Sequence, residues 1–200
     1  MRTAIAMVVM LCVGAVAPAW AADTASAISD DHPLFTIMMP AADARLEGRF
    51  VQEKTLEDLD ATIESKGSFT FSVDQGLRWR VSEPVASELR ITREQIVEIQ
   101  NGEEVMRMAT EDQPMTRVIT EIFFSMFTGN RDALEQYFEL VGSRTADRWT
   151  LHLDPVDDSV ASVMASIELV GDQQVEEMIL RETNGDTTRI RLEDVRLSQP

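Results

Sequence analysis

The chain has 200 residues, of which 44% are hydrophobic, and a formal net charge of −17 at pH 7. This length allows one domain with a sizeable core, and the acidity argues against binding to nucleic acid and to anionic lipid surfaces, since like charges repel. The simplest interpretation of the charge is solubility; the alternative is a protein that works near membranes and must not adhere to them.

The first residues have the layout of a secretory signal peptide. Arg2 precedes an apolar run over residues 4–20, and the small residues Ala19, Ala21 and Ala22 fit a cleavage site. We place cleavage after Ala21, so that residues 1–21 are the expected signal peptide. No later segment has the ~20 apolar residues needed to cross a bilayer, and we expect an exported, periplasmic protein.

Cys12, the only cysteine, lies within the signal. Leu11 precedes it and apolar residues follow it, whereas a lipoprotein signal has a small residue before the cysteine and the end of the apolar run after it. The mature chain is therefore expected to lack thiols, which excludes disulfides, thiolate catalysis and cysteine metal sites.

After the signal, residues 22–33 are small, polar and acidic and predict a loose leader. Residues 34–200 are expected to form a single domain. Residues 34–48, which contain Pro40, predict one or two helical turns, and the strand-like segments 49–56 and 60–67 follow.

Residues 67–84 predict two strands joined by a tight turn. Side chains alternate across a strand, so one face of this pair carries Phe69, Phe71, Leu77, Trp79 and Val81. The opposite face of the second strand carries Arg78 and Arg80. The apolar face is either an ordinary core or the lining of a space for a bound molecule.

Three turn signals predict further hairpins. Asn101-Gly102, Gly171-Asp172 and Asn184-Gly185 each separate two strand-like segments. With a two-residue turn at 101–102, Val97 is expected to face Met106, with Ile99 and Met108 on the same side. Together with strand-like segments at 149–154 and 165–170, this spacing predicts a mainly β, antiparallel meander with few helices.

Residues 115–129 predict an amphipathic helix instead. Pro114 suits a first helical position and Gly129 ends the pattern. The apolar face consists of Met115, Val118, Ile119, Ile122, Phe123, Met126 and Phe127. Thr116, Arg117, Thr120 and Glu121 are expected on the polar side. Shorter helical turns are predicted within 131–140 and 157–165.

The chain offers little for catalysis. Its two histidines are His32 in the leader and His152 in a predicted strand, where His152 is expected to face solvent. Metalloprotease, serine-hydrolase and phosphate-loop motifs do not occur. Asp154, Asp157 and Asp158 fit no calcium-loop spacing and predict a solvated loop. We expect no enzyme, no catalytic residue, no metal site and no cofactor.

The segment 48–72 has the order of motifs found in one protein family. Phe50, Gln52 and Lys54 fill an F-x-Q-x-K pattern, and a glycine-led strand with Phe69 and Phe71 follows. An aromatic strand then ends near Pro84, and residues 166–195 are similar to a closing meander. Over residues 45–197 the chain resembles the LolA-type and LolA-like outer-membrane lipoprotein carrier proteins.

The resemblance implies a half-open antiparallel β-barrel around an apolar cavity, covered by short lid helices. It implies a periplasmic carrier that takes acylated lipoproteins or other lipid cargo from an inner-membrane donor complex to an outer-membrane acceptor. Such a carrier touches membrane proteins only transiently, and we expect a monomer. The alternative is a protein-binding or sensor module that recognises lipoproteins or other partners with the same half-barrel.

The cavity is expected to be lined by residues of the strands and of the helix, since Met and Phe adapt to irregular cargo. These are Phe50, Phe69, Phe71, Leu77, Trp79, Val81, Met106, Met108, Val118, Ile119, Ile122, Phe123, Met126 and Phe127. The chain departs from well-known family members at Val73, where they have an arginine that ties the lid to the barrel. Lid control or cargo is therefore expected to differ.

Overall fold

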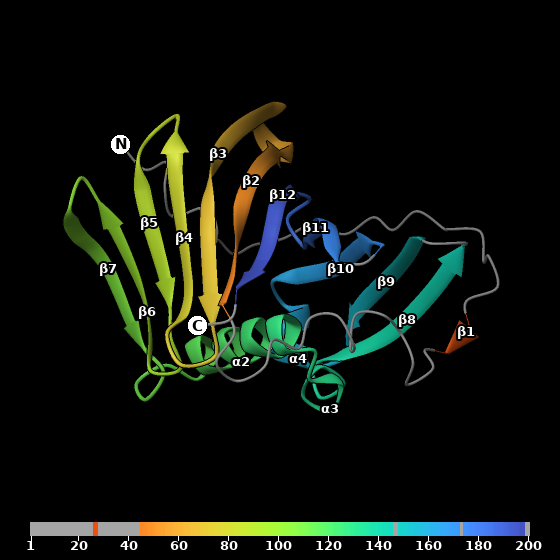
Figure 1. Ribbon diagram of the computed structural model, residues 1–200. Helices are drawn as coiled ribbons and strands as arrows, with labels where there is room; N and C mark the ends of the chain where they lie inside the picture. Colours follow the sequence, from red (N-terminus) through yellow and green to blue (C-terminus); the bar gives the residue numbers. More distant parts are fainter. Residues whose placement is uncertain (1–25, 28–44, 146–147, 173, 199–200) are drawn as a thin grey trace.

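The computed structural model of the chain (Figure 1) describes residues 26–27, 45–145, 148–172 and 174–198. The predicted signal peptide lies outside these residues, as do residues 28–44. Two residues of the predicted leader form β1 (Ser26–Ala27), which pairs with Val141 and Gly142. The helical turns predicted for 34–48 are wrong over 45–48, which is strand from Arg45 onward.

The fold is built on one antiparallel sheet of twelve strands. After β1 these are β2 (Arg45–Leu56), β3 (Ala61–Ser72), β4 (Gly76–Glu83), β5 (Ser87–Ile91), β6 (Gln95–Gln100), β7 (Glu103–Ala109), β8 (Phe138–Thr145), β9 (Arg148–Pro155), β10 (Met164–Gly171), β11 (Val175–Glu182) and β12 (Thr187–Ser198). The helices are η1 (Glu57–Leu59), α2 (Pro114–Thr128), α3 (Arg131–Leu134) and α4 (Asp158–Ala161). None of these described helices has the length and hydrophobicity to span a bilayer.

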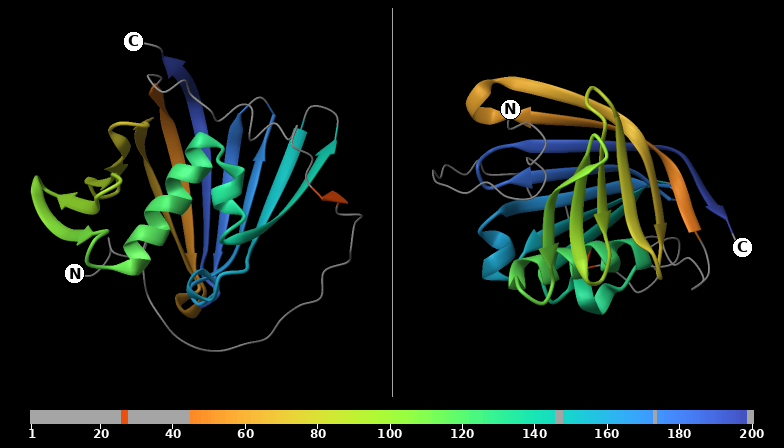
Figure 2. Two further views of the ribbon diagram at one scale, coloured as in Figure 1. Left: turned by 90° about the horizontal axis from the view of Figure 1, so that it is seen from below. Right: turned by 90° about the vertical axis from the view of Figure 1, so that its left-hand side faces the viewer.

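The sheet is open and curved. Its strand order is β1-β8-β9-β10-β11-β12-β2-β3-β4-β5-β6-β7, so β1 and β7 end the described sheet and do not pair with each other. The pairing of β12 with β2 joins two limbs, β2–β7 and β8–β12. Figure 2 shows the sheet bending around α2, which lies across its concave side. This arrangement confirms the predicted half-open antiparallel barrel with helices on its open side.

The predicted hairpins are present, and their turns have the backbone that the sequence requires. Asn101 and Gly102 both have positive φ, at 52° and 82°, as a two-residue hairpin turn demands. Gly185 in the β11–β12 turn has φ 91°. The predicted facing of Val97 and Met106 is wrong, however, because a bulge near Val105 shifts the register. Met106 lies opposite Glu98, and Val97 lies opposite Arg107.

The predicted central helix is confirmed as α2. Pro114 occupies its first turn, where a missing backbone N–H costs nothing. Gly129 ends it in the left-handed region, with φ 64°, and its N–H donates to the carbonyl of Ser125. The sequence pattern missed β5, whose five residues are too few to display a clear alternation.

Candidate functional site

The inner face of β2–β4 carries stacked rings. We call Phe50, Phe69, Phe71, Leu77, Trp79 and Val81 the aromatic wall. Phe69 pairs across β3 and β4 with Trp79, and Phe71 pairs with Leu77. The Trp79 ring stacks on Phe50 with centroids 3.7 Å apart and on Phe69 with centroids 5.9 Å apart. The alternation in residues 67–84 therefore produces one continuous aromatic surface.

Two glycines make room for these rings. Gly67 lies opposite Phe50, and a Cβ there would fall 2.7 Å from the Phe50 ring and 1.8 Å from the Arg80 carbonyl oxygen. Gly48 lies opposite Phe69, where a Cβ would fall 2.8 Å from that ring. The glycines thus allow each ring to lie flat across the neighbouring strand. The close approach of the rings therefore explains why a glycine, Gly67, precedes Phe69 and Phe71 in the sequence.

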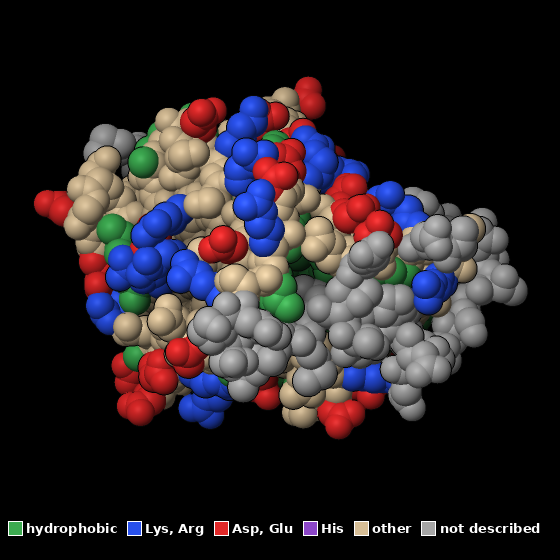
Figure 3. Space-filling view, in the orientation of Figure 1, with side chains coloured by type: hydrophobic (Ala, Val, Ile, Leu, Met, Phe, Trp, Pro, Cys, Tyr) green, Lys and Arg blue, Asp and Glu red, His purple; other side chains and the backbone are tan. Residues whose placement is uncertain are grey.

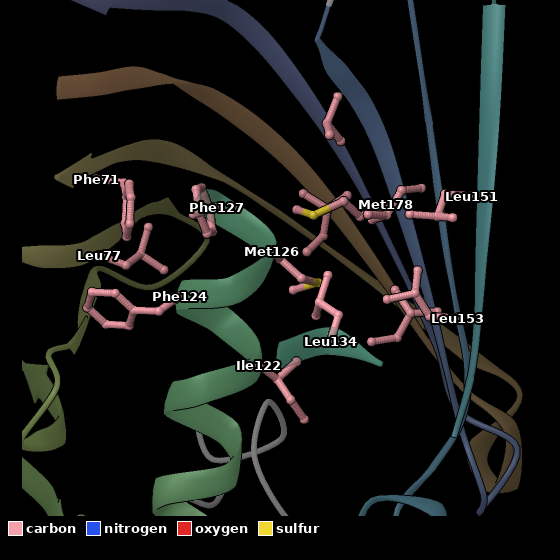
Figure 4. Close-up of a cluster of buried hydrophobic side chains, with 14 of the residues drawn as sticks. Phe71, Leu77, Ile122, Phe124, Met126, Phe127, Leu134, Leu151, Leu153 and Met178 are labelled. Carbon is pink, nitrogen blue, oxygen red and sulfur yellow. The ribbon is translucent and has the colours of Figure 1, made fainter. Parts of the chain in front are cut away.

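Helix α2 packs its own rings against the aromatic wall. Phe127 stacks on Phe71 with centroids 4.7 Å apart, and Phe124 meets Phe71 edge to face at 5.6 Å. Phe123 stacks on Phe127 at 5.5 Å and is half-buried. Figure 4 shows Phe124 and Phe127 projecting toward Phe71 and Leu77. The helix therefore occupies the apolar concave side of the sheet.

The limb β8–β12 supplies the opposite side of the interior. We use the name aliphatic wall for seven of its buried residues: Leu140, Leu151, Leu153, Ile167, Leu169, Met178 and Ile190. The limb also buries two aromatic residues, Phe138 and Trp149. In Figure 4, Met126 of α2 lies between Phe127 and the residues Leu134, Met178 and Leu153. The sequence pattern missed this wall. The available signal was the alternation of Trp149, Leu151 and Leu153 on β9.

The structure brings all fourteen predicted lining residues into one apolar cluster. Phe50, Phe69, Phe71, Leu77, Trp79, Ile122, Met126 and Phe127 are buried in it. Val81, Met106, Met108, Val118, Ile119 and Phe123 are partly buried and pack against it. Six of these fourteen residues, all on α2, thus share one cluster with the residues of the strands. Binding of cargo by these residues remains a prediction.

The predicted polar side of α2 is partly wrong. Thr116 and Thr120 are buried, at 2% and 5% exposure, although the pattern assigned them to solvent. The reason is tertiary: α2 lies between two limbs of the sheet and is covered on more than one face. Arg117 is exposed, as expected.

Several polar groups lie inside the interior. Lys54 of the F-x-Q-x-K pattern is buried, and its ammonium lies 2.6 Å from Glu182 and 3.5 Å from Asp186. Glu98 is buried and accepts a hydrogen bond of 2.8 Å from the Gln100 amide. Among the described residues, Gln52 Oε1, Trp79 Nε1 and Thr120 Oγ1 are buried without a hydrogen-bond partner. Such groups normally find a partner.

Contacts outside the interior hold α2 in place. The Arg93 guanidinium lies over the Phe124 ring, 4.6 Å from its centroid. The Tyr137 hydroxyl donates to Glu121 at 2.8 Å. Burial, together with this bond to a carboxylate, raises the pKa of Tyr137 to about 12. A hollow of about 270 Å³ lies between these groups, lined by Arg93, Arg117, Glu121 and Phe124 among others.

Val73, at the position where the resemblance implies an arginine, packs against the apolar cluster. Arg93, from the β5–β6 turn, supplies a cationic contact to the helix instead. Sequence reasoning missed Arg93, because only the fold brings that turn beside α2.

The polar residues considered for catalysis make contacts that stabilise the fold. His152 lies on the outer face, 3.4 Å from Glu168 across β9 and β10, as predicted for a solvent-facing residue. Asp157 caps α4 by accepting from the N–H groups of Ser159 and Val160 at 2.9 and 3.1 Å. In the described part of the chain, no group of three or more His, Cys, Asp or Glu side chains is placed to hold a metal ion.

The chain was compared with curated proteins, with solved structures and with the sequence models of protein families. The comparison with curated proteins gave no match. Among solved structures, a LolA superfamily protein from Nitrosomonas europaea has 10% identity and a TM-score of 0.46, covering 84% of this chain and 91% of that one. The Pseudomonas aeruginosa MucA/MucB complex has 15% identity and a TM-score of 0.46, covering 84% of this chain and 56% of that one.

A domain of a putative outer membrane lipoprotein-sorting protein from Vibrio parahaemolyticus has 8% identity and a TM-score of 0.37, covering 82% of this chain and 89% of that one. The sequence model of one family, described as the outer membrane lipoprotein carrier protein LolA, matches residues 44–200. The match starts at the beginning of β2 and spans the open sheet and α2. The chain therefore belongs to the LolA family.

Proposed function

We propose that the protein is a periplasmic carrier that encloses the acyl chains of lipoproteins or related lipid cargo. It receives them from an inner-membrane donor and delivers them to an outer-membrane acceptor. One observation carries this proposal: a helix, α2, packs on the apolar concave face of a sheet that does not close. Displacing α2 would open the part of the apolar surface that this helix covers.

Acyl chains suit this surface physically. Each buried methylene contributes ~0.8 kcal/mol, so cargo with long chains leaves a bilayer only for an equally apolar enclosure. When α2 swings away, the rings of Phe124 and Phe127 leave contacts on Phe71 that an acyl chain can replace. The exchange substitutes one apolar contact for another, and no empty cavity has to be maintained.

The interior also offers polar contacts to the linkage of an acyl chain. Trp79 Nε1 has no partner among the described residues and can donate to an ester or amide carbonyl. Gln52 Oε1 is likewise without a partner and can accept. These atoms lie on the sheet, which stays in place when the helix moves. They favour acyl esters and amides over pure hydrocarbons.

The first test is native mass spectrometry of the gently purified mature protein, followed by extraction of bound molecules. We expect a mass excess that resolves into an acylated species, and displacement of that species by a fluorescent fatty-acid probe. A clean unliganded mass together with no uptake of the probe would overturn the carrier and favour the protein-binding alternative.

A matched pair of variants tests the place of binding. Phe123→Glu puts a carboxylate among the stacked rings of α2. It should lower the affinity for the fatty-acid probe at least about tenfold, because an unpaired charge resists burial. Leu59→Glu is the control, since Leu59 is 70% exposed in η1. Equal affinities in both variants would show that α2 does not line the site.

A further inference from the structure

The outer face of β3–β5 carries arginines in unusual proximity for so acidic a protein. Arg78 on β4 lies directly opposite Arg90 on β5, and Thr70 on β3 lies on the other side of Arg78. Side chains in such cross-strand pairs are about 5 Å apart at Cβ, and like charges opposite each other are destabilising. Figure 3 shows basic side chains gathered over β4 and β5. This arrangement costs stability unless an anion shares the site.

The acids nearby do not balance these cations. Glu88 lies 3.4 Å from Arg78 and 2.6 Å from Arg80, and it also pairs with Arg90. Arg45 is 3.8 Å from Glu47. Among the described residues, these four arginines pair with two glutamates, which leaves two positive charges in this group on a chain whose net charge is −17. Within the described residues, Arg78 has Glu88 as its single acidic neighbour.

A hollow lies among these residues. It has a volume of about 100 Å³ and is lined by Arg45, Arg78 and Arg90 together with the hydroxyl side chains of Thr70, Ser72 and Thr92. None of its lining residues is acidic. Its floor is the β3–β4 turn, where Gly76 with φ 75° packs against the Ile91 carbonyl, so that a Cβ there would fall 2.1 Å from that oxygen. The turn is therefore fixed against β5.

The donor set defines the ligand. Each guanidinium presents five N–H donors in a planar fork, which matches the oxygens of a tetrahedral oxyanion, and the hydroxyls of Thr70 and Ser72 can donate to the same oxygens. A doubly charged phosphate would neutralise the two unbalanced charges. We propose that this hollow binds a phosphate-class oxyanion, either free or as the headgroup of a membrane lipid. The Arg78 and Arg90 side chains lie on the opposite face of the sheet from the apolar interior, and the hollow is also lined by Phe71 and Leu77 of the aromatic wall.

The test titrates the mature protein with inorganic phosphate. Binding is monitored by isothermal titration calorimetry and by the NMR shifts of the backbone amides of Thr70, Ser72 and Thr92. The double variant Arg78→Gln/Arg90→Gln should weaken phosphate binding at least about tenfold. The control Arg189→Gln/Arg191→Gln removes the same charge from β12, where each arginine has its own glutamate, Glu177 or Glu53. It should leave binding unchanged. Thermal melting checks that both variants fold.

A second arm separates the two sources of phosphate. Flotation with vesicles of phosphatidylglycerol and phosphatidylcholine should retain the protein if the ligand is a headgroup, and the Arg78/Arg90 variant should lose this retention. Binding of inorganic phosphate without vesicle binding assigns a free ligand. Absence of both, or equal losses in the two double variants, would overturn the site. Acyl-probe affinity is expected to be unchanged, which separates this result from the carrier proposal.

Discussion

The two walls of the interior are built on different principles. In the aromatic wall, flat rings stack over glycines and meet the rings of α2 face to face or edge to face. In the aliphatic wall, branched side chains such as Leu151 and Leu153 are fully buried, with 0% exposure, and lie opposite branched side chains of β10. Flat surfaces separate without disturbing their neighbours, whereas interlocked side chains do not. We infer that the aromatic wall with α2 is the adaptable half and the aliphatic wall the fixed half.

The largest effect is expected from a deletion in the fixed half. Leu151→Ala should lower the free energy of unfolding by roughly 4 kcal/mol, because a fully buried leucine leaves a cavity that its neighbours cannot fill. Urea denaturation measures the loss. The affinity for an acyl probe, measured on the folded fraction, should stay within about twofold.

The counterpart in the adaptable half is Phe127→Leu. This change should cost less stability, about 1 kcal/mol, and should alter probe affinity more than Leu151→Ala does. The reverse ranking of the two affinities would show that the aliphatic wall makes the decisive contacts with cargo.

The next effect tests the steric basis of the aromatic wall. Gly67→Ala should cost about 3 kcal/mol, since its Cβ would meet a backbone oxygen that cannot rotate away. Gly48→Ala should cost less, because its closest contact is the ring of Phe69. Urea denaturation of the two variants ranks their losses of unfolding free energy. Equal losses would mean that contact with the rings, and not contact with the backbone of the neighbouring strand, determines the cost.

A smaller effect concerns the attachment of α2. Tyr137 has a pKa raised to about 12 by burial and by its hydrogen bond to Glu121. The neutral phenol is therefore favoured in the folded state, and this stabilisation is fully present below pH 10, the ordinary pKa of tyrosine, and is lost as the pH rises toward the folded value. Tyr137 is the only tyrosine in the chain, so phenolate absorbance reports it directly.

Two variants complete the Tyr137 experiment. Glu121→Gln should shift the phenolate transition toward its ordinary value, and Tyr137→Phe should remove the loss of stability above pH 10. Appearance of phenolate near pH 10 in the unmodified protein would contradict the bond to Glu121.

The smallest effect is expected at Arg93. Arg93→Gln removes a cation over the Phe124 ring, which contributes about 0.5–1 kcal/mol at an exposed site. The rate of probe entry should rise a few-fold with little change in melting temperature. Arg107→Gln is the control, because Arg107 pairs with Glu104 on its own strand, β7, and donates to Gln95 on β6. Identical entry rates would show that Arg93 does not restrain the helix.

The features predicted from sequence are those set by short segments. Asn101-Gly102 defines a hairpin because both positions take positive φ, and Pro114 and Gly129 mark the helix because each suits only one end of it. The alternation of residues 69–81 similarly identified one inner face. Local chemistry determines each of these.

The features that sequence reasoning missed depend on contacts between distant segments. The bulge near Val105 places Met106 opposite Glu98 instead of Val97. Thr120 is buried because α2 is covered on a second face. The aliphatic wall and the contact of Arg93 with Phe124 arise when β8–β12 and the β5–β6 turn approach α2. The opposition of Arg78 and Arg90 likewise depends on strand register, which composition does not reveal.

The same bulge near Val105 has a consequence for the behaviour of the protein at high concentration. The open sheet ends in β7, whose outer backbone groups could pair with a second molecule. The bulge bends that strand, and Glu103, Glu104 and Arg107 place charges along it. These features discourage edge-to-edge association and the growth of intermolecular sheets. The bulge that shifts the register of Met106 thus helps this open barrel to resist self-association at high concentration.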